Sequence, residues 1–287
     1  MKAIFKHELR LYFESMTAYV FGAFLLLFIG IGSMLYNLRS AVSNFEFVLS
    51  FASIIFVVIV PVLTMRCLSE ERKQKTDQLL YSLPISTTQV VLGKYGALLV
   101  VFFIPMCFVA LYPLLFSRFG EVYLPTAYGS LAAFFLLGAA LLSVGVFLSS
   151  LTDSQGLAAG LGIGTILLNY YCVSLSEYVT STAVGSLVTF LVLLAALGLL
   201  VRALTRNNAL AIGVFLVGCA GLAGVYLLDS AALEGLLPGI MKQISLFERF
   251  YTFVNGVFDL TGVVYYLSVI VFFLFLTVQS LEKRRYN

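Results

Sequence analysis

The chain has 287 residues, of which 61% are hydrophobic and 11% are charged, and its formal net charge is +3. A soluble domain of ordinary composition carries about 25% charged residues. The composition therefore excludes a water-soluble globule and indicates a protein embedded in a lipid bilayer. We expect no nucleic-acid partner.

Eight apolar stretches are long enough to cross a bilayer, since a helical span takes about 20 residues. They are Ala18–Tyr36, Phe47–Thr64, Tyr95–Phe116, Ala127–Ser150, Gly156–Ser176, Val179–Val201, Asn208–Leu228 and Thr261–Leu281. Spanning segments must be helices or closed barrels, and these continuous apolar runs lack the alternation of strands. The sequence predicts an all-α polytopic membrane protein with about eight transmembrane helices, forming one permease-like domain over residues 1–287.

None of the eight stretches contains Asp, Glu, Lys, Arg or His. Ionisable side chains at membrane depth mark proton relays, ion sites and buried catalytic groups. Their absence indicates that the energy for any uphill transport comes from a partner. The four cysteines have no C-x-x-C spacing, so neither a disulfide nor a metal site is predicted.

The distribution of Lys and Arg predicts the orientation, because these residues are enriched in cytosolic loops. If the N-terminus is cytosolic, an even number of spans returns the C-terminus to the cytosol as well. Most basic residues then lie on the cytosolic side. The exceptions are Arg39, Arg118, Lys242 and Arg249.

Residues 1–17 form an amphipathic segment in which Phe5, Leu9, Tyr12 and Phe13 recur at helical spacing beside basic residues. Such a helix lies in the plane of the membrane interface. Two interpretations are open. Either the basic start only fixes the topology, or the segment is an elbow helix against which a cytosolic partner docks.

The largest predicted cytosolic segment is residues 65–94. Pro84 disfavours a helical conformation at the residue before it, so a first helix ends there. Ser86 and Gln89 have the spacing of a capping box that opens a second helix leading into the third span. The first helix also carries apolar residues that have no membrane to enter, namely Leu79, Leu80, Tyr81 and Leu83. This hairpin either packs back on the bundle or binds another protein.

Two further features lie at the start of the fifth span. The turn before it contains Thr152, Asp153 and Gln155 and is either a second partner contact or a plain connection between helices. One face of the span carries Gly156, Gly160 and Gly164, which permits close approach of membrane helices. That face is either a dimer seam or an internal helix contact.

The outer segment 229–260 is too polar to span, yet apolar residues recur in it at helical spacing around Glu248 and Arg249. This pattern predicts short amphipathic helices that dip into the outer leaflet. Irregular backbone at that depth is tolerated only against protein or a cavity, so these helices are expected to cap the bundle.

A set of collinear motifs resembles a known family. They are Leu63-Thr64-Met65-Arg66, Glu70-Glu71-Arg72-Lys73, Thr76, Leu79-Leu80, Ser82-x-Pro84, Val91-Leu92-Gly93-Lys94, Ser149-Ser150-Leu151-Thr152, Ser245-Leu246-Phe247 and Phe273-Leu274-x-Leu276-Thr277. In this order they are similar to type-2 ABC exporter permeases, most closely the gliding-motility branch. The likeness covers residues 1–172 and 236–287. Residues 179–228 are an extra helix pair beyond the six spans usual in that family.

The resemblance implies a permease subunit without an ATPase of its own. A separate P-loop ABC ATPase would bind ATP and Mg²⁺, so the chain binds no cofactor directly and is not itself an enzyme. A second permease chain would complete a homo- or heterodimer in the bacterial cytoplasmic membrane. The extra helix pair would either bind an accessory membrane protein or widen the dimer seam.

The resemblance also assigns roles to individual residues. Those implied in ATPase coupling are Arg66, Glu70, Glu71, Arg72, Thr76, Leu79, Leu80, Leu83 and Pro84. Those implied in an extracellular gate are Phe247, Phe250, Phe253, Gly256 and Asp259.

Other functions are weighed from the residues themselves. A P-loop is missing, since Gly93-Lys94 lacks the upstream glycine. A secondary transporter needs polar groups at broken mid-membrane helices, and Asn169 is the only carboxamide deep in a predicted span. An intramembrane enzyme would need more than the sole histidine, His7, in the amphipathic segment. The main alternative to an exporter of an amphipathic or lipid-like substrate is a non-transporting anchor that recruits an ATPase to a larger machine.

Overall fold

The computed structural model describes residues 2–74, 86–179 and 234–285, with a few positions between 182 and 222. Over these residues the chain is helical and contains no strand, which confirms the all-α prediction. The chain divides into two compact units. The first comprises Met1–Tyr170 with Leu246–Asn287, and the second comprises Tyr171–Ser245.

Five described helical segments are long and apolar enough to cross a membrane. They are Thr17–Arg39 (α2, Thr17–Ser33, continued by the π-helix η1, Met34–Arg39), Thr87–Phe116 (α7, Thr87–Val109, and α8, Leu111–Phe116), α9 (Leu124–Leu151), α10 (Gln155–Tyr178) and α15 (Leu260–Arg285). Each corresponds to a predicted stretch. The chain is therefore a multi-pass membrane protein. The predicted spans Val179–Val201 and Asn208–Leu228 lie outside the described residues.

The second predicted span is broken, whereas the sequence predicted one continuous helix over Phe47–Thr64. α3 (Glu46–Ser53) and α4 (Phe56–Thr64) meet at an angle of 59°. At the break, the backbone bonds of Ile55 and Val57 tighten to the i−3 carbonyl, and the hydroxyl of Ser53 donates to the carbonyl of Ser50 at 2.7 Å. Such a local serine bond competes with the helical ladder and bends the helix. The pair can still form a sixth span.

The start of α7 follows directly from local sequence. Ser86 is extended, and its hydroxyl accepts a hydrogen bond from the backbone N–H of Gln89. This contact satisfies one of the N–H groups that every helix leaves unpaired at its start. The predicted helix start at Ser86 is confirmed.

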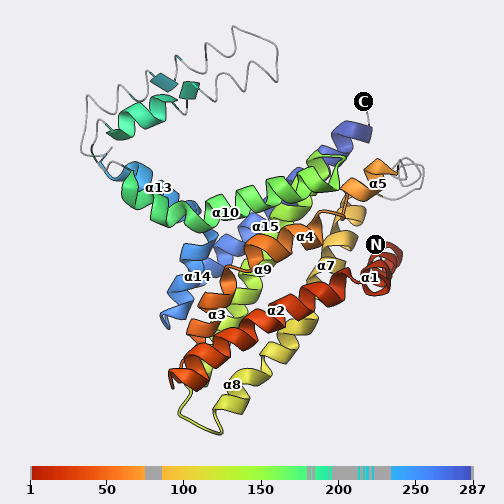
Figure 1. The fold of residues 1–287 in the computed structure, drawn as a ribbon. Helices are drawn as coiled ribbons and strands as arrows, with labels where there is room; N and C mark the ends of the chain where they lie inside the picture. The colour runs from red at the N-terminus through yellow and green to blue at the C-terminus, as the bar shows by residue number, and fades with distance from the viewer. Residues whose placement is uncertain are drawn as a thin grey trace. The chain divides into compact units, whose positions relative to one another are not determined.

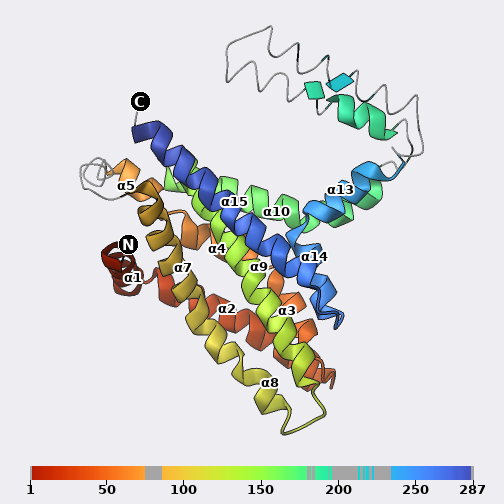
Figure 2. The same cartoon turned by 180° about the vertical axis from the view of Figure 1, so that it is seen from behind.

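α9 is the central helix of the first unit and contacts α3, α4, α7, α14 and α15 (Figure 1). α15 lies along it over much of its length (Figure 2). Aromatic rings fill the interior, and Phe56 packs against Phe102 and Phe134 with ring centroids 5.7 and 4.6 Å apart. Glycines let α9 approach its neighbours, since a Cβ on Gly138 would collide with the Phe102 ring.

The second unit contains the described helix α13 (Leu236–Ile244). Gly235 precedes it with φ +68°, a left-handed conformation that favours glycine. Within this unit the thiol of Cys172 donates to the carbonyl of Met241 at 3.3 Å.

Candidate functional site

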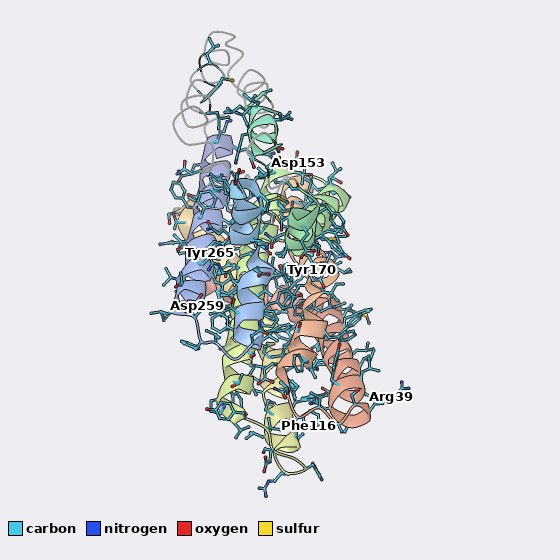
Figure 3. The ribbon with its side chains drawn as sticks, turned by 90° about the vertical axis from the view of Figure 1, so that its left-hand side faces the viewer. Arg39, Phe116, Asp153, Tyr170, Asp259 and Tyr265 are labelled. Atoms are coloured by element: carbon cyan, nitrogen blue, oxygen red, sulfur yellow. The ribbon has the colours of Figure 1, made fainter. Side chains whose placement is uncertain are left out.

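One end of the first unit gathers most of its ion pairs, and we call it the charged end. It comprises α1 (Lys2–Glu14), α5 (Ser69–Lys73), the first turns of α7, the turn 152–154 and the last turns of α15. Figure 3 shows Asp153 at this end and Arg39 and Phe116 at the opposite end. The predicted coupling segment and the predicted second turn therefore lie at the same end of the bundle.

A buried lysine lies at the centre of the charged end. Lys94 on α7 donates to Glu8 of α1 at 2.6 Å and to Glu71 of α5 at 2.8 Å. The side chains are 2%, 8% and 28% exposed, respectively. A buried charge is tolerated only when it is paired, so these three residues hold three separate helices together. We call them the Lys94 triad.

The sequence places α1 close enough for this triad because α7 carries glycines where the two helices meet. A Cβ on Gly93 would lie 3.1 Å from the Ile4 side chain, and one on Gly96 would lie 3.4 Å from the Phe5 ring. Small residues allow such close helix packing. The contact brings Glu8 over the first turns of α7.

A cavity of about 490 Å³ adjoins the triad. Its walls come from α1 and from residues 66–74, and they include Arg66, Glu70 and the triad itself. Cys67 is buried beside it, and burial raises the pKa of its thiol to about 12. Burial also raises the pKa of Tyr12 well above its ordinary value, so both groups stay neutral. The cavity therefore combines charged and neutral polar groups.

The coupling segment is also tied to the end of α9. The hydroxyl of Ser149 accepts hydrogen bonds from the backbone N–H groups of Leu68 and Ser69 at 3.1 and 3.2 Å. The same hydroxyl donates to the carbonyl of Met65 at 3.3 Å. These N–H groups open α5, so a side chain from a distant helix supplies the cap that local residues do not. A movement of α5 would act directly on α9.

Asp153 joins the same segment to the end of α15. Its carboxylate accepts a hydrogen bond from Arg284 at 2.8 Å and lies 3.9 Å from a guanidinium nitrogen of Arg72. The hydrogen bond from Arg284 lowers the pKa of Asp153, with the charge of Arg72 acting in the same direction. The carboxylate is therefore ionised at neutral pH. Thr152 shapes the turn by accepting a bond from the Ser154 N–H at 3.0 Å.

Two further bonds fix the last turns of α15. The hydroxyl of Ser280 donates to the carbonyl of Ser150 at 3.3 Å, and the hydroxyl of Thr87 donates to the carboxylate of Glu282 at 2.8 Å. α15 is thus connected to α9 and to the first turn of α7. The charged end is a network of five helices.

α14 (Leu246–Val254) lies away from the charged end and packs against α3, α9 and α15. Its Phe247, Phe250 and Phe253 are all buried. The first backbone N–H of α14 donates to the amide oxygen of Asn169 at 3.0 Å, and Ser130 of α9 donates to the carbonyl of Phe253 at 3.1 Å. The three predicted gate aromatics therefore belong to one packed helix.

The link from α14 to α15 is a tight turn. Gly256 has φ +80°, a left-handed conformation that favours glycine. Asp259 is exposed and accepts a hydrogen bond from the Thr261 N–H at 2.9 Å, which lowers the pKa of its carboxyl group and caps α15. Both residues shape this turn.

A comparison with protein-family models matches residues 18–183 to the ABC-2 family transporter proteins. The match includes α2, the broken pair α3 and α4, the coupling segment, α7, α9 and α10. The chain belongs to the ABC-2 transporter family. No curated protein matched the chain in a separate comparison. Membership makes this ABC-2 protein a membrane permease component of an ABC transporter.

The ABC-2 protein brings together several residues predicted for coupling. Glu71 and Arg72 point into the network, whereas Arg66 and Glu70 line the cavity. Gln155 is the first residue of α10. The other predicted coupling residues, Thr76, Leu79, Leu80, Leu83 and Pro84, lie outside the described residues.

Glycine packing differs from the simple stripe of the sequence. A Cβ on Gly160 or Gly164 would meet no atom of the described residues within 4 Å, and one on Gly156 would only reach the Ser154 hydroxyl at 4.0 Å. The close contact is made by Gly162, where a Cβ would lie 2.9 Å from the Pro61 side chain. Within the described part of the chain, the predicted stripe is therefore left without an internal helix partner.

Sequence reasoning missed the roles of Glu8, Lys94, Ser149 and Arg284. Lys94 was placed in the loop just before the third span, but it lies two turns inside α7. A lysine among apolar neighbours in a helix is a signal for a buried ion pair. The sequence contains no comparable signal for its partners.

Proposed function

We propose that this ABC-2 protein is the permease subunit of an ATP-driven exporter and that a separate ABC ATPase docks at its charged end. The observation that carries the proposal is the connection of α5 to four other helices. The Lys94 triad links α5 to α1 and α7, Ser149 links it to α9, and Asp153 links it to α15. A force applied by a partner at α5 would reach all of them.

In the proposed mechanism, ATP closes a pair of partner ATPases and their movement tilts the permease as a rigid body. A bistable assembly amplifies small displacements in this way because packed interfaces have discrete arrangements. ATP and Mg²⁺ bind the partner, and the chain contributes no catalytic residue. Leu79, Leu80 and Leu83 would supply the apolar anchor for the ATPase.

The outer helix α14 would act as the gate. Its aromatic side chains pack on α9, with Phe134 and Phe250 ring centroids 5.8 Å apart. A tilt of α9 would therefore displace α14. A second permease chain would complete the pathway, and the face of α10 that carries Gly160 and Gly164 is the proposed seam, because close neighbours there are absent from the described chain.

This function sets the orientation and the location. The charged end and both termini would be cytosolic, since the ATP is there, and α1 would serve as the elbow helix in the interface. We propose eight spans, a place in the bacterial cytoplasmic membrane and a relationship to the gliding-motility branch. An amphipathic or lipid-like substrate fits the Phe-rich spans, and residues 179–228 would either bind an accessory membrane protein or widen the dimer seam.

The proposal is tested by co-purification of the chain with the ABC ATPase encoded beside it. The variant Leu80→Asp should abolish the complex and the associated ATP turnover. Phe119→Asp is the matched control, because Phe119 is an apolar side chain at the opposite end and is 90% exposed. Loss of the complex in both variants, or in neither, would contradict docking at the coupling segment. A stable complex that never exports a substrate would favour the alternative role of a membrane anchor that recruits an ATPase.

A further inference from the structure

A groove runs beside the last two turns of α15, where this helix passes the end of α9 (Figure 2). Its volume is about 400 Å³, and it is lined by Leu151, Leu276, Gln279, Ser280, Lys283 and Arg284. The α15 residues recur at spacings of three and four, so they form one face of the helix. The groove is not part of the coupling contacts described above, although Ser280 and Arg284 border both.

The groove changes character along its length. Leu276 and Leu151 form its apolar part, and Lys283 and Arg284 form its basic part, two turns further along α15. The membrane span of α15 ends at Arg284. The basic part therefore lies where the head groups of the bilayer begin, and the apolar part lies where their acyl chains begin.

The charges around the groove do not balance. Arg284 shares the single carboxylate of Asp153 with Arg72. Glu282 accepts a hydrogen bond from Thr87. Lys283 is exposed and makes no ion pair with any residue that the structure describes. Three cations thus face two carboxylates, which leaves an excess of positive charge at the mouth of the groove.

We propose that this groove binds an anionic phospholipid. The phosphate lies against Lys283 and Arg284, Gln279 and Ser280 contact the polar head group, and one acyl chain lies along Leu276 and Leu151. Basic pockets between membrane helices bind such head groups on the side where anionic lipids gather. A bound lipid would join α15 to the turn at Asp153. The inference does not depend on the transport function.

The protein contains no tryptophan, which allows a direct test at the groove. A single tryptophan introduced as Leu276→Trp is the only indole in the full-length chain, and brominated lipids quench it on contact. Phe108→Trp is the matched control, because Phe108 is an exposed aromatic residue on α7 and is not part of the groove. Both proteins are reconstituted into phosphatidylcholine vesicles with increasing brominated phosphatidylglycerol or brominated phosphatidylcholine.

We expect Leu276→Trp to bind phosphatidylglycerol several-fold more strongly than phosphatidylcholine, and Phe108→Trp to show a ratio near one. One Lys or Arg near an anionic lipid changes a binding constant by about fivefold, so adding Lys283→Gln should reduce the preference by about that factor. Equal quenching at Leu276→Trp, or a preference that Lys283→Gln does not change, would overturn the proposal. If millimolar inorganic phosphate removes the preference and chloride of equal ionic strength does not, a soluble phosphate occupies the groove and the lipid assignment is wrong.

Discussion

The Lys94 triad makes a quantitative prediction about stability. Replacing Lys94 by Met removes the cation and leaves the buried carboxylate of Glu8 without its partner. Breaking a buried ion pair by removing one member costs about 3–5 kcal/mol. For a protein of this size, 1 kcal/mol corresponds to roughly 2–4 °C in unfolding temperature. We therefore expect Lys94→Met to unfold about 10 °C below the wild type.

The two carboxylates should contribute unequally. Glu71 is 28% exposed and Glu8 is 8% exposed, so water compensates the loss at Glu71 more readily. Glu71→Gln is expected to cost about 1 kcal/mol and Glu8→Gln about twice as much, since Lys94 keeps one carboxylate in each case. The triple variant Lys94→Met, Glu8→Gln, Glu71→Gln should recover most of the loss, because it leaves no buried charge.

The assay is the unfolding midpoint of the purified chain in detergent at one fixed heating rate, read from the loss of helical circular dichroism. The recovery in the triple variant separates electrostatic loss from simple loss of packing. The reasoning is refuted if Lys94→Met unfolds with the wild type, or if the triple variant is less stable than Lys94→Met.

Three further predictions concern single positions. Ser149→Ala should cost roughly 2 kcal/mol, because two buried N–H groups at the start of α5 lose their acceptor. Ser143→Ala, on the same helix, should change the unfolding midpoint little, since its hydroxyl only donates to a carbonyl three residues earlier; equal effects would count against the long-range cap. Gly145→Ala should cost about 1–3 kcal/mol, because its Cβ would lie 2.9 Å from a threonine Cβ of α4. Gly160→Ala should leave the isolated chain as stable or slightly more stable, as no described atom lies near, and a large loss in the isolated chain would show that this face is packed internally. Burial raises the pKa of Cys67 to about 12, so its thiol stays protonated below that pH and N-ethylmaleimide should not label it at pH 8 until the protein unfolds. Rapid labelling of the folded protein, located by mass spectrometry, would show that this thiol is accessible and ionised.

The elements that depend on local sequence were predictable. Continuous apolar runs identified the six spans that the structure describes, and the Ser86 cap followed from two residues three positions apart. The break between α3 and α4 was not foreseen, because the apolar run continues across it unchanged. It depends on a single serine hydroxyl that donates within its own turn.

The network at the charged end depends on residues far apart in the chain. Lys94 and Glu8 are 86 positions apart, and Ser149 and Leu68 are 81 positions apart. No local pattern reports such pairs, and a single sequence contains no covariation. The resemblance to a family located the segment, but not that Glu71 binds within its own chain. Similarly, glycine spacing found the stripe on α10, whereas the tertiary contact with Pro61 selected Gly162.

The central claim is that a partner ATPase docks at the charged end, on the side of the membrane that contains ATP. The most direct measurement is photo-cross-linking in intact cells, with a benzophenone amino acid placed at Lys73 or, as a control, at Phe119. Both side chains are exposed, and they lie at opposite ends of the first unit. The account predicts an adduct between the chain and the ABC ATPase from position 73 and none from position 119. An adduct from position 119, or none from position 73 while the complex still co-purifies, would contradict it.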